Sequence, residues 1–488
     1  MLLSRFRVVL SWHVLIALLM PAMAAAVAQK APQKLHQQKS RSSAASSQEK
    51  APARSKRDRD PVIAQIIKDV SPERVRQTDE KLVSFSNRST LSVNNPGAAT
   101  SAQGIVAARN WIKSEFERIS EDCNGCLEVK TDTFIEAPKN RIPVPTEIQN
   151  VYAILKGTDP AQSRRIYLVT GHYDSRNTDT LNTTDPAPGA NDDGSGTTVS
   201  IECARVLSKH KFPATIIFLT VAGEEQGLNG STHFAKMAKE QGWQLEGVLN
   251  NDIVGGNTTP GDTLQNKNWV RVFSEGIPAA ATDADLRRIK ATGGENDSSS
   301  RLLARYVRAV GESYDFGAFT PKLIFRRDRY LRGGDHSAFN DSGFAAVRFT
   351  EYREDFNHQH QNVRTENGIE YGDLPKFVDF DYVANVARLN AATLAALASS
   401  PAPPPEVHLL TKQLENDSKI EWKSAPGATA YEVLWRKTTD PDFSDEDSVR
   451  TTETKIDLPD SKDNVIFGVR SVDGKGHRSL IVIPEPER

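Results

Sequence analysis

Three apolar runs in the middle of the chain each end in acidic residues or a histidine, which are side chains that bind metal ions and transfer protons. The runs cover residues 166–170, 214–221 and 245–249. In chain order, the polar residues that follow them are His172 and Asp174, then Glu224 and Glu225, then Asp252. Imidazole nitrogens and carboxylate oxygens are common zinc ligands, and a carboxylate that binds no metal can accept a proton. This pattern predicts a metal site.

A fourth acidic segment, Pro-Gly-Ala-Asn-Asp-Asp-Gly-Ser-Gly at residues 188–196, contains Asp192. A hydrolytic pair of metal ions needs histidine and carboxylate ligands, one carboxylate that bridges both ions, and one free carboxylate for proton transfer. The chain offers this set: His172, Asp192, Glu225, Asp252 and a later histidine as ligands, with Glu224 left over. Any one of these residues alone would more often be a capping or hydrogen-bonded polar residue. Five of them at successive strand ends favour a metal site.

The elements that must position these residues are predicted to be buried parallel strands. The apolar runs are short, are bounded by glycine, and alternate with helical patterns such as residues 197–210. In open α/β sheets, ligands gather at the carboxyl ends of the strands. We therefore predict an α/β fold with a mostly parallel mixed sheet flanked by helices. Within it, residues 150–156 and 165–170 are expected to be neighbouring strands.

The segments that carry the candidate ligands resemble those of the M28 family of zinc aminopeptidases, which use two metal ions together. They are His172-Tyr173-Asp174-Ser175, the loop of residues 188–196, Gly223-Glu224-Glu225-Gln226-Gly227-Leu228 and Asn251-Asp252. Their order and spacing match over roughly residues 62–400. The resemblance implies a zinc exopeptidase-like fold, two Zn²⁺ ions per chain, and removal of N-terminal residues from peptide substrates.

Carried over residue by residue, the resemblance also implies a role for each side chain. His172 and Asp252 would hold one zinc ion, Glu225 and a later histidine would hold the other, and Asp192 would bridge them. Asp174 would fix the imidazole of His172. The ions would polarise the scissile carbonyl and acidify a bridging water, and Glu224 would take the proton of that water as general base.

The last histidine ligand departs from the family pattern, which is Tyr-His followed four residues later by Asp. His358 follows Asn357 and has Asn362 at that spacing, whereas His360 has Arg364 there. We choose His358 over His360. The missing tyrosine leaves the oxyanion donor open. His336 lies in Gly-Gly-Asp-His-Ser, which resembles a packing motif of the family, and is not expected to bind metal.

Several other functions are compatible with parts of the pattern. The same resemblance covers carboxypeptidases and glutaminyl cyclases, so it does not decide which end of a peptide is recognised. From another class, the chain could be a non-catalytic exported binding or adhesion protein, although the complete ligand set disfavours this. Serine hydrolase chemistry has little support, because Asp341-Ser342-Gly343 is no nucleophile elbow. A His-Glu-x-x-His metalloprotease motif is absent from the sequence.

At 488 residues the chain is expected to form more than one domain. In order, we predict a signal peptide (1–28), a disordered linker (29–60), the M28-like peptidase domain (61–400), a proline-rich linker (401–405) and a fibronectin type III-like β-sandwich (406–488). The signal is expected to direct the protein outside the cytoplasm, to the periplasm or the medium, and no stable membrane insertion is expected after its cleavage; an uncleaved N-terminal anchor is the alternative. The oligomeric state stays undetermined.

The net charge bears on the possible partners of the protein, and the cysteines bear on its compartment. A net charge of −2 gives no general attraction to nucleic acid. Cys123 and Cys126 are expected to form a small structural disulfide outside the cytoplasm rather than a redox couple. Cys203 lies in a helical pattern and is expected to be a buried free thiol.

Overall fold

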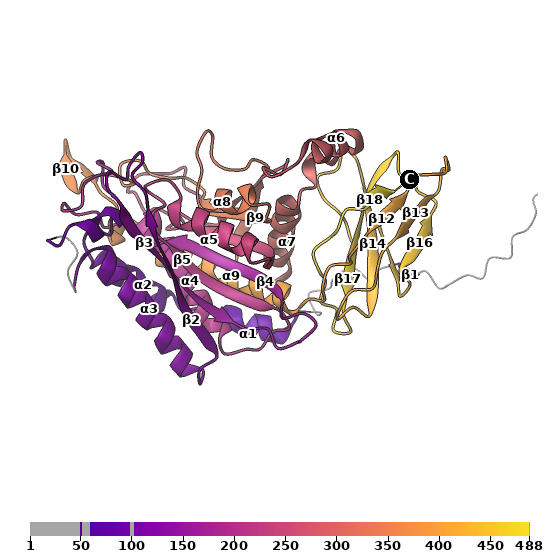
Figure 1. The fold of residues 1–488 in the computed structure, drawn as a ribbon, viewed down its shortest axis with the longest axis horizontal. Coiled ribbons are helices and arrows are strands. Elements are labelled where there is room, and N and C mark those ends of the chain that lie inside the picture. Colours follow the sequence, from indigo (N-terminus) through magenta and orange to yellow (C-terminus); the bar gives the residue numbers. More distant parts are fainter. Residues whose placement is uncertain (1–48, 51–58, 98–101, 488) are drawn as a thin grey trace, which may run out of the picture. The chain divides into compact units, whose positions relative to one another are not determined.

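The computed structural model describes residues 49–50, 59–97 and 102–487 (Figure 1). The predicted signal peptide, residues 1–28, lies outside the described residues. Within the described part of the chain, no helix combines the length and the apolar character that crossing a bilayer requires.

A mixed sheet of eight strands forms the centre of the larger part of the chain. Its strands are β2 (Leu127–Glu136), β3 (Thr146–Leu155), β4 (Arg165–His172), β5 (Thr215–Val221), β6 (Gln244–Asn251), β7 (Trp269–Ser274), β8 (Thr320–Ile324) and β9 (Ala346–Glu351). They are arranged in the order β2-β3-β5-β4-β6-β9-β7-β8. The four central strands, β5, β4, β6 and β9, run parallel to one another. The predicted α/β class and mixed sheet are confirmed.

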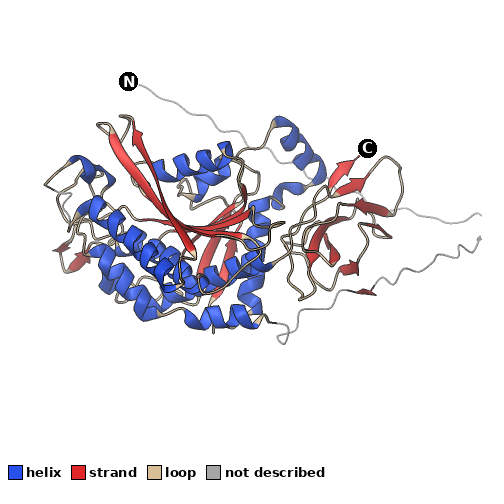
Figure 2. Cartoon of the chain, turned by 60° about the horizontal axis from the view of Figure 1, so that its bottom comes forward, coloured by secondary structure: helices blue, strands red, loops and turns tan. Residues whose placement is uncertain are grey.

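Helices accompany the sheet (Figure 2). The α-helices are α1 (Pro61–Asp69), α2 (Pro72–Val83), α3 (Gly104–Asp122), α4 (Gly196–Leu207), α5 (Asn229–Glu240), α6 (Asp283–Thr292), α7 (Ser299–Ser313), α8 (His336–Asp341) and α9 (Phe380–Ser399). Shorter helical turns are η2 (Thr90–Asn94), η3 (Ala190–Ser195), η4 (Gly294–Asn296) and η5 (Pro375–Phe377).

Both faces of the sheet are covered, and β4 shows why. Successive residues of a strand point to opposite faces. Leu168 packs in an apolar cluster with Phe234 of α5 and Phe339 of α8, whereas Val169 belongs to a larger cluster with residues of α1 to α4, α7 and α9. Because both of its faces are buried, the strand is a continuous apolar run rather than an alternating one.

Two details of the sheet differ from the sequence-based expectation. The strands expected to be neighbours, β3 and β4, are separated by β5, which pairs with both of them. The crossover from β4 through α4 returns the chain beside β4, so that β5 takes the adjacent position. Neither edge strand, β2 nor β8, was expected. Most of their residues are exposed or only partly buried, which leaves only a weak apolar pattern in the sequence.

Residues after α9 form further strands: β12 (His408–Leu410), β13 (Ser418–Glu421), β14 (Ala430–Lys437), β15 (Ser448–Thr451), β16 (Lys455–Leu458), β17 (Val465–Val472) and β18 (Glu485–Glu487). They make two four-stranded sheets, ordered β1-β15-β14-β17 and β16-β13-β12-β18. Ile420, Trp422, Val433 and Val469 share one buried cluster that joins both sheets. The strand β1 (Glu49–Lys50) pairs with β15, although these two residues were expected to belong to a disordered linker.

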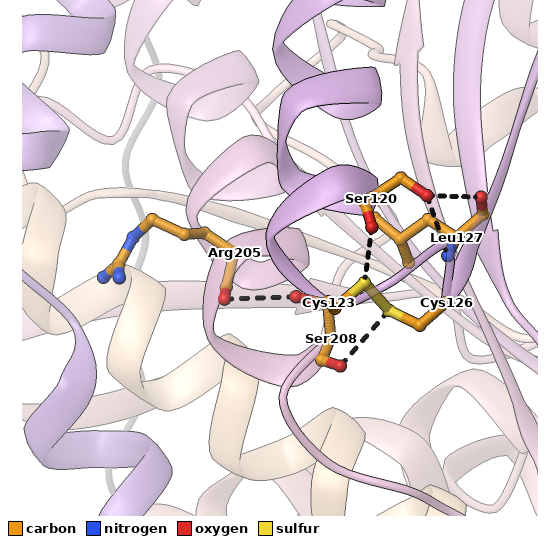
Figure 3. Close-up of a disulfide and its surroundings, with 6 residues drawn as sticks. All are labelled: Ser120, Cys123, Cys126, Leu127, Arg205 and Ser208. Atoms are coloured by element: carbon orange, nitrogen blue, oxygen red, sulfur yellow. Dashed lines mark hydrogen bonds between the residues drawn. A yellow bond between two sulfur atoms is a disulfide. The ribbon is translucent and has the colours of Figure 1, made fainter.

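Cys123 and Cys126 form a disulfide at the turn between α3 and β2 (Figure 3). The hydroxyl of Ser120 donates a hydrogen bond to the carbonyl of Leu127 in the same turn, at 2.8 Å. The Sγ atom of Cys126 lies 3.3 Å from the carbonyl oxygen of Ser208, which follows α4. The bridge therefore links a helix end to an edge strand, as a structural disulfide does. Cys203 is free and buried, as predicted.

Candidate metal centre

The first group of candidate ligands brings together His172, Asp192 and Asp252. His172 is the last residue of β4, and Asp252 directly follows β6, which pairs in parallel with β4. Asp192 reaches them from the η3 loop that precedes α4. One ligand atom from each residue lies within 4.8 Å of the others, and all three residues are buried. The parallel pairing places the two strand ends at one edge of the sheet, as the sequence predicts.

A second group shares Asp192 with the first and adds Glu225 and His360. The Nε2 atom of His360 lies 2.9 Å from Oδ2 of Asp192 and 3.0 Å from Oε1 of Glu225. On the other side, Nε2 of His172 lies 3.1 Å from Oδ1 of Asp192. Each oxygen of the Asp192 carboxylate therefore faces a different histidine, which is the arrangement that a bridging carboxylate requires.

His358, the histidine chosen from the sequence, is not part of either group. Its ring stacks on Phe377 with the ring centres 3.7 Å apart, and its Nδ1 lies 3.9 Å from a carboxylate oxygen of Asp355. His360 takes the expected place instead. Its backbone has φ = 57°, a left-handed conformation that is uncommon for residues other than glycine. Such a local turn decides which of two nearby histidines faces the cluster, and the sequence carries no signal for it.

Asp174 contacts His172 and the two glutamates that follow β5, and its backbone oxygen lies 3.1 Å from Nδ1 of His172. Its Oδ1 lies 3.4 Å from Nδ1 of His172. Its carboxylate also accepts hydrogen bonds from the backbone N–H groups of Glu224 and Glu225, at 3.4 and 3.3 Å, and from the hydroxyl of Thr90 at 3.1 Å. One buried carboxylate thus fixes a histidine at the end of β4 relative to the two glutamates after β5.

Glu224 lies beside the cluster without belonging to either ligand group. Burial is the main cause that raises its pKa well above the ordinary value, and the negative charges of Glu225 and Asp252 add to this effect. Burial therefore favours the protonated form of this carboxyl group, which is the form that a general base adopts after it accepts a proton. Its position and its affinity for a proton fit the predicted role of general base.

The loop that carries Asp192 is held by two acidic residues that sequence reasoning did not assign. Asp193 accepts hydrogen bonds from the backbone N–H groups of His172 (2.9 Å), Gly196 (2.9 Å) and Ile253 (3.3 Å), and so ties β4, α4 and the end of β6 together. Asp373 accepts from the backbone N–H groups of Asn191 and Asp192, at 2.8 and 2.7 Å.

Asp373 follows a hairpin formed by β10 (Arg364–Glu366) and β11 (Ile369–Tyr371). In the family pattern, an aspartate stands four positions after the histidine ligand. In this chain the hairpin separates His360 from the acidic residue that contacts the Asp192 loop. A fixed spacing therefore misses Asp373, and only the fold brings it to the site.

The donor set fits zinc. Nε2 of His172 and Oε1 of Glu225 are buried and have no hydrogen-bond partner. Buried polar atoms nearly always have a partner. Although burial opposes a charged imidazole, the carboxylates of Glu225 and Asp192 raise the pKa of His360 to about 10. Two imidazoles and three carboxylates that attract positive charge this strongly are suitable ligands for zinc.

The fold and the site define a class, the zinc metallopeptidases, and comparisons with known proteins specify it. The profile of Peptidase family M28 matches residues 150–379. A protein of Pyrenophora teres f. teres named "Probable zinc metalloprotease" is 44% identical over 426 residues, which cover 86% of each chain. A protein of Leptosphaeria maculans with the same description is 42% identical and covers 87% of this chain and 97% of its own length.

The chain therefore belongs to peptidase family M28 and is a zinc metallopeptidase. Among solved structures, the LapA aminopeptidase of Legionella pneumophila is similar to it with a TM-score of 0.48 and 21% identity, covering 72% of this chain and 76% of that one.

Proposed function

We propose that this metallopeptidase is an exported aminopeptidase that removes N-terminal residues from peptides with two zinc ions. The observation that carries the proposal is the position of Asp192, whose two carboxylate oxygens face His172 and His360 at 3.1 and 2.9 Å. His172 and Asp252 would hold one ion, Glu225 and His360 the other, and Asp192 both. Zinc ions bound there would polarise the scissile carbonyl and acidify the attacking water.

The chain's own residues then supply the proton transfer. Glu224 is close enough to the cluster for its pKa to respond to His172, Glu225 and Asp252, yet it is not needed as a ligand. In this proposal its carboxylate takes the proton of the attacking water and delivers it to the leaving amine. Asp174 keeps the imidazole of His172 in place during the reaction.

The charges around the centre favour the amino end of a peptide. A carboxypeptidase needs a free cation to bind the terminal carboxylate of its substrate. Among the described residues, three arginines next to the cluster already have partners there. Arg348 lies 2.7 Å from Asp252, Arg176 lies 3.7 Å from Glu225, and Arg141 donates a hydrogen bond to the backbone oxygen of Glu225 at 3.0 Å. The acidic groups that surround the cluster would instead attract the ammonium group at the start of a peptide.

A substrate panel tests the proposed specificity. Aminoacyl-nitroanilides and N-blocked peptides with a free C-terminus are compared with and without a zinc chelator. We expect chelator-sensitive release of nitroaniline and no cleavage of the blocked peptides. Cleavage of the blocked peptides alone would indicate a carboxypeptidase. Cyclisation of a peptide with N-terminal glutamine would indicate a glutaminyl cyclase. Inactivity of the zinc-loaded protein would favour a binding protein.

The proposed export is supported by the Cys123–Cys126 disulfide, because disulfides persist mainly outside the cytosol. We also propose that residues 406–488 are a fibronectin type III-like accessory domain, which the two sheets around the buried cluster of Trp422 and Val433 support. The N-terminal sequence of the protein recovered from outside the cells tests cleavage after the predicted signal. An intact N-terminus together with a cytosolic location would refute export.

A further inference from the structure

Arg348 is a fully buried arginine that contacts a candidate metal ligand. It lies in β9 opposite Asn250 of β6, two residues before Asp252. Its Nη2 atom is 2.7 Å from Oδ1 of Asp252 and 3.4 Å from the backbone oxygen of the same residue. A guanidinium group is always charged in proteins. A fixed positive charge therefore lies behind one ligand carboxylate of the proposed centre.

The surrounding residues hold this charge in place. Nη1 of Arg348 lies 3.3 Å from Oδ2 of Asp328 and donates a hydrogen bond to the backbone oxygen of Gly333 at 3.0 Å. A Cβ atom on Gly334 would lie 2.3 Å from Nη1 of Arg348 and 3.2 Å from Oδ2 of Asp252. Any side chain at position 334 would therefore displace the guanidinium group. The Gly-Gly pair of the Gly-Gly-Asp-His-Ser segment leaves the space that the arginine fills.

The second ligand group has no equivalent contact. Two arginines lie beside Glu225. The Nε atom of Arg176 lies 3.7 Å from Oε2 and makes no hydrogen bond, and Arg141 donates a hydrogen bond to the backbone oxygen of Glu225 at 3.0 Å rather than to its carboxylate. Coulomb energy falls with distance, so the positive charge 2.7 Å from the Asp252 carboxylate opposes a cation there more than the charge 3.7 Å from the Glu225 carboxylate does. The two halves of the cluster therefore differ in the charge that a zinc ion would meet.

We propose that Arg348 weakens zinc binding at the His172–Asp252 position, so that the two positions fill in sequence and this one is the first to lose its ion. The inference rests on the two-zinc ligand set proposed above. In this account Arg348 is a positioning residue that acts through Asp252. It holds the carboxylate in one orientation, and its charge opposes the ion that the carboxylate binds.

The test is a zinc titration of the metal-free full-length protein in competition with a chromophoric chelator. For the wild-type protein we expect two binding steps whose affinities differ at least tenfold, and Asp252→Asn should abolish the weaker step. Arg348→Met should raise the zinc affinity of the weaker step at least tenfold and change the affinity of the tighter step less than threefold. Arg348→Lys, which keeps the charge, should stay within threefold of wild type.

Arg329→Met is the matched control. Arg329 also contacts Asp328, at 3.1 Å, and it pairs with Glu354 rather than with a ligand. Loss of the Arg329 side chain should change the zinc affinity of neither step more than threefold. The inference is overturned if Arg348→Met lowers the zinc affinity of the weaker step, leaves it unchanged, or changes the affinity of both steps equally. It is also overturned if Arg329→Met has the same effect as Arg348→Met. A third contradicting result is loss of the tighter step in Asp252→Asn.

If Arg348→Met does not fold, Asp328→Asn tests whether the charge of Arg348 weakens zinc binding. Removing the carboxylate of Asp328 leaves the charge of Arg348 less compensated, so the weaker step should loosen at least threefold. An unchanged step would contradict the inference. Failure of the proposed centre is distinguishable from failure of the inference, because wild-type protein that binds fewer than two zinc ions refutes the centre itself.

Discussion

The strand ends of the central sheet and the segment after β9 both contribute candidate ligands, but they do so in different ways. His172 and Asp252 come from β4 and β6, two neighbouring parallel strands, and the paired strands bring them together. His360 comes from an irregular segment and depends on a left-handed residue. The difference shows that a sheet places ligands by its pairing, whereas a loop places them by local turns that must be observed.

The largest expected effect is at a strand end. Glu224→Gln keeps the shape of the side chain but cannot accept the proton, so kcat should fall by about 10²–10⁴-fold while both zinc ions stay bound. Steady-state kinetics on an aminoacyl-nitroanilide and elemental analysis of the same sample check this. Glu225→Gln is the control and should lose zinc. Activity close to wild type in zinc-loaded Glu224→Gln would remove Glu224 from the mechanism.

The next prediction separates the two histidines of the loop. His360→Ala should lose one zinc ion per chain and most of the activity, because His360 faces Asp192 and Glu225. His358→Ala should retain both ions and cost only about 1 kcal/mol of stability through the lost stacking on Phe377. Zinc content and thermal melts measure both effects. The assignment is reversed if His358→Ala loses zinc and His360→Ala does not.

A smaller effect is expected at the end of β9, which carries a buried acid that belongs to neither ligand group. Glu351 accepts hydrogen bonds from the backbone N–H of Asn257 and the side-chain amide of Asn191. Burial raises its pKa from 4.5 to about 8. The folded state therefore binds more protons than the unfolded state between these values, and the wild-type protein loses stability as pH rises through this window.

Glu351→Gln removes that titration. Relative to wild type, the variant should gain roughly 4 kcal/mol between pH 5 and pH 9, because a shift of one pKa unit corresponds to about 1.4 kcal/mol. Urea unfolding at several pH values measures the difference. A difference between variant and wild type that stays constant with pH would show that Glu351 is not protonated in the folded protein.

The parts of the fold and site that the sequence predicts share one property, which is that regular pairing or packing determines them. The strands β4, β5 and β6 coincide with apolar runs bounded by glycine and polar residues, so they and the polar residues after them are visible as a pattern. The edge strand β2, the position of β5 between β3 and β4, and the contacts of Asp193, Asp373 and Arg348 depend on tertiary contacts between distant segments. His360 depends on one backbone angle. None of these leaves a periodic signal in the chain.

The zinc content of wild-type protein and of Asp192→Ala, determined side by side by elemental analysis, tests the shared carboxylate most directly. With both proteins equilibrated with excess zinc, so that the weaker position is also filled, the account predicts two ions per wild-type chain and fewer than one in the variant, because both positions lose a ligand at once. One ion per wild-type chain, or an unchanged content in a folded Asp192→Ala variant, would contradict it.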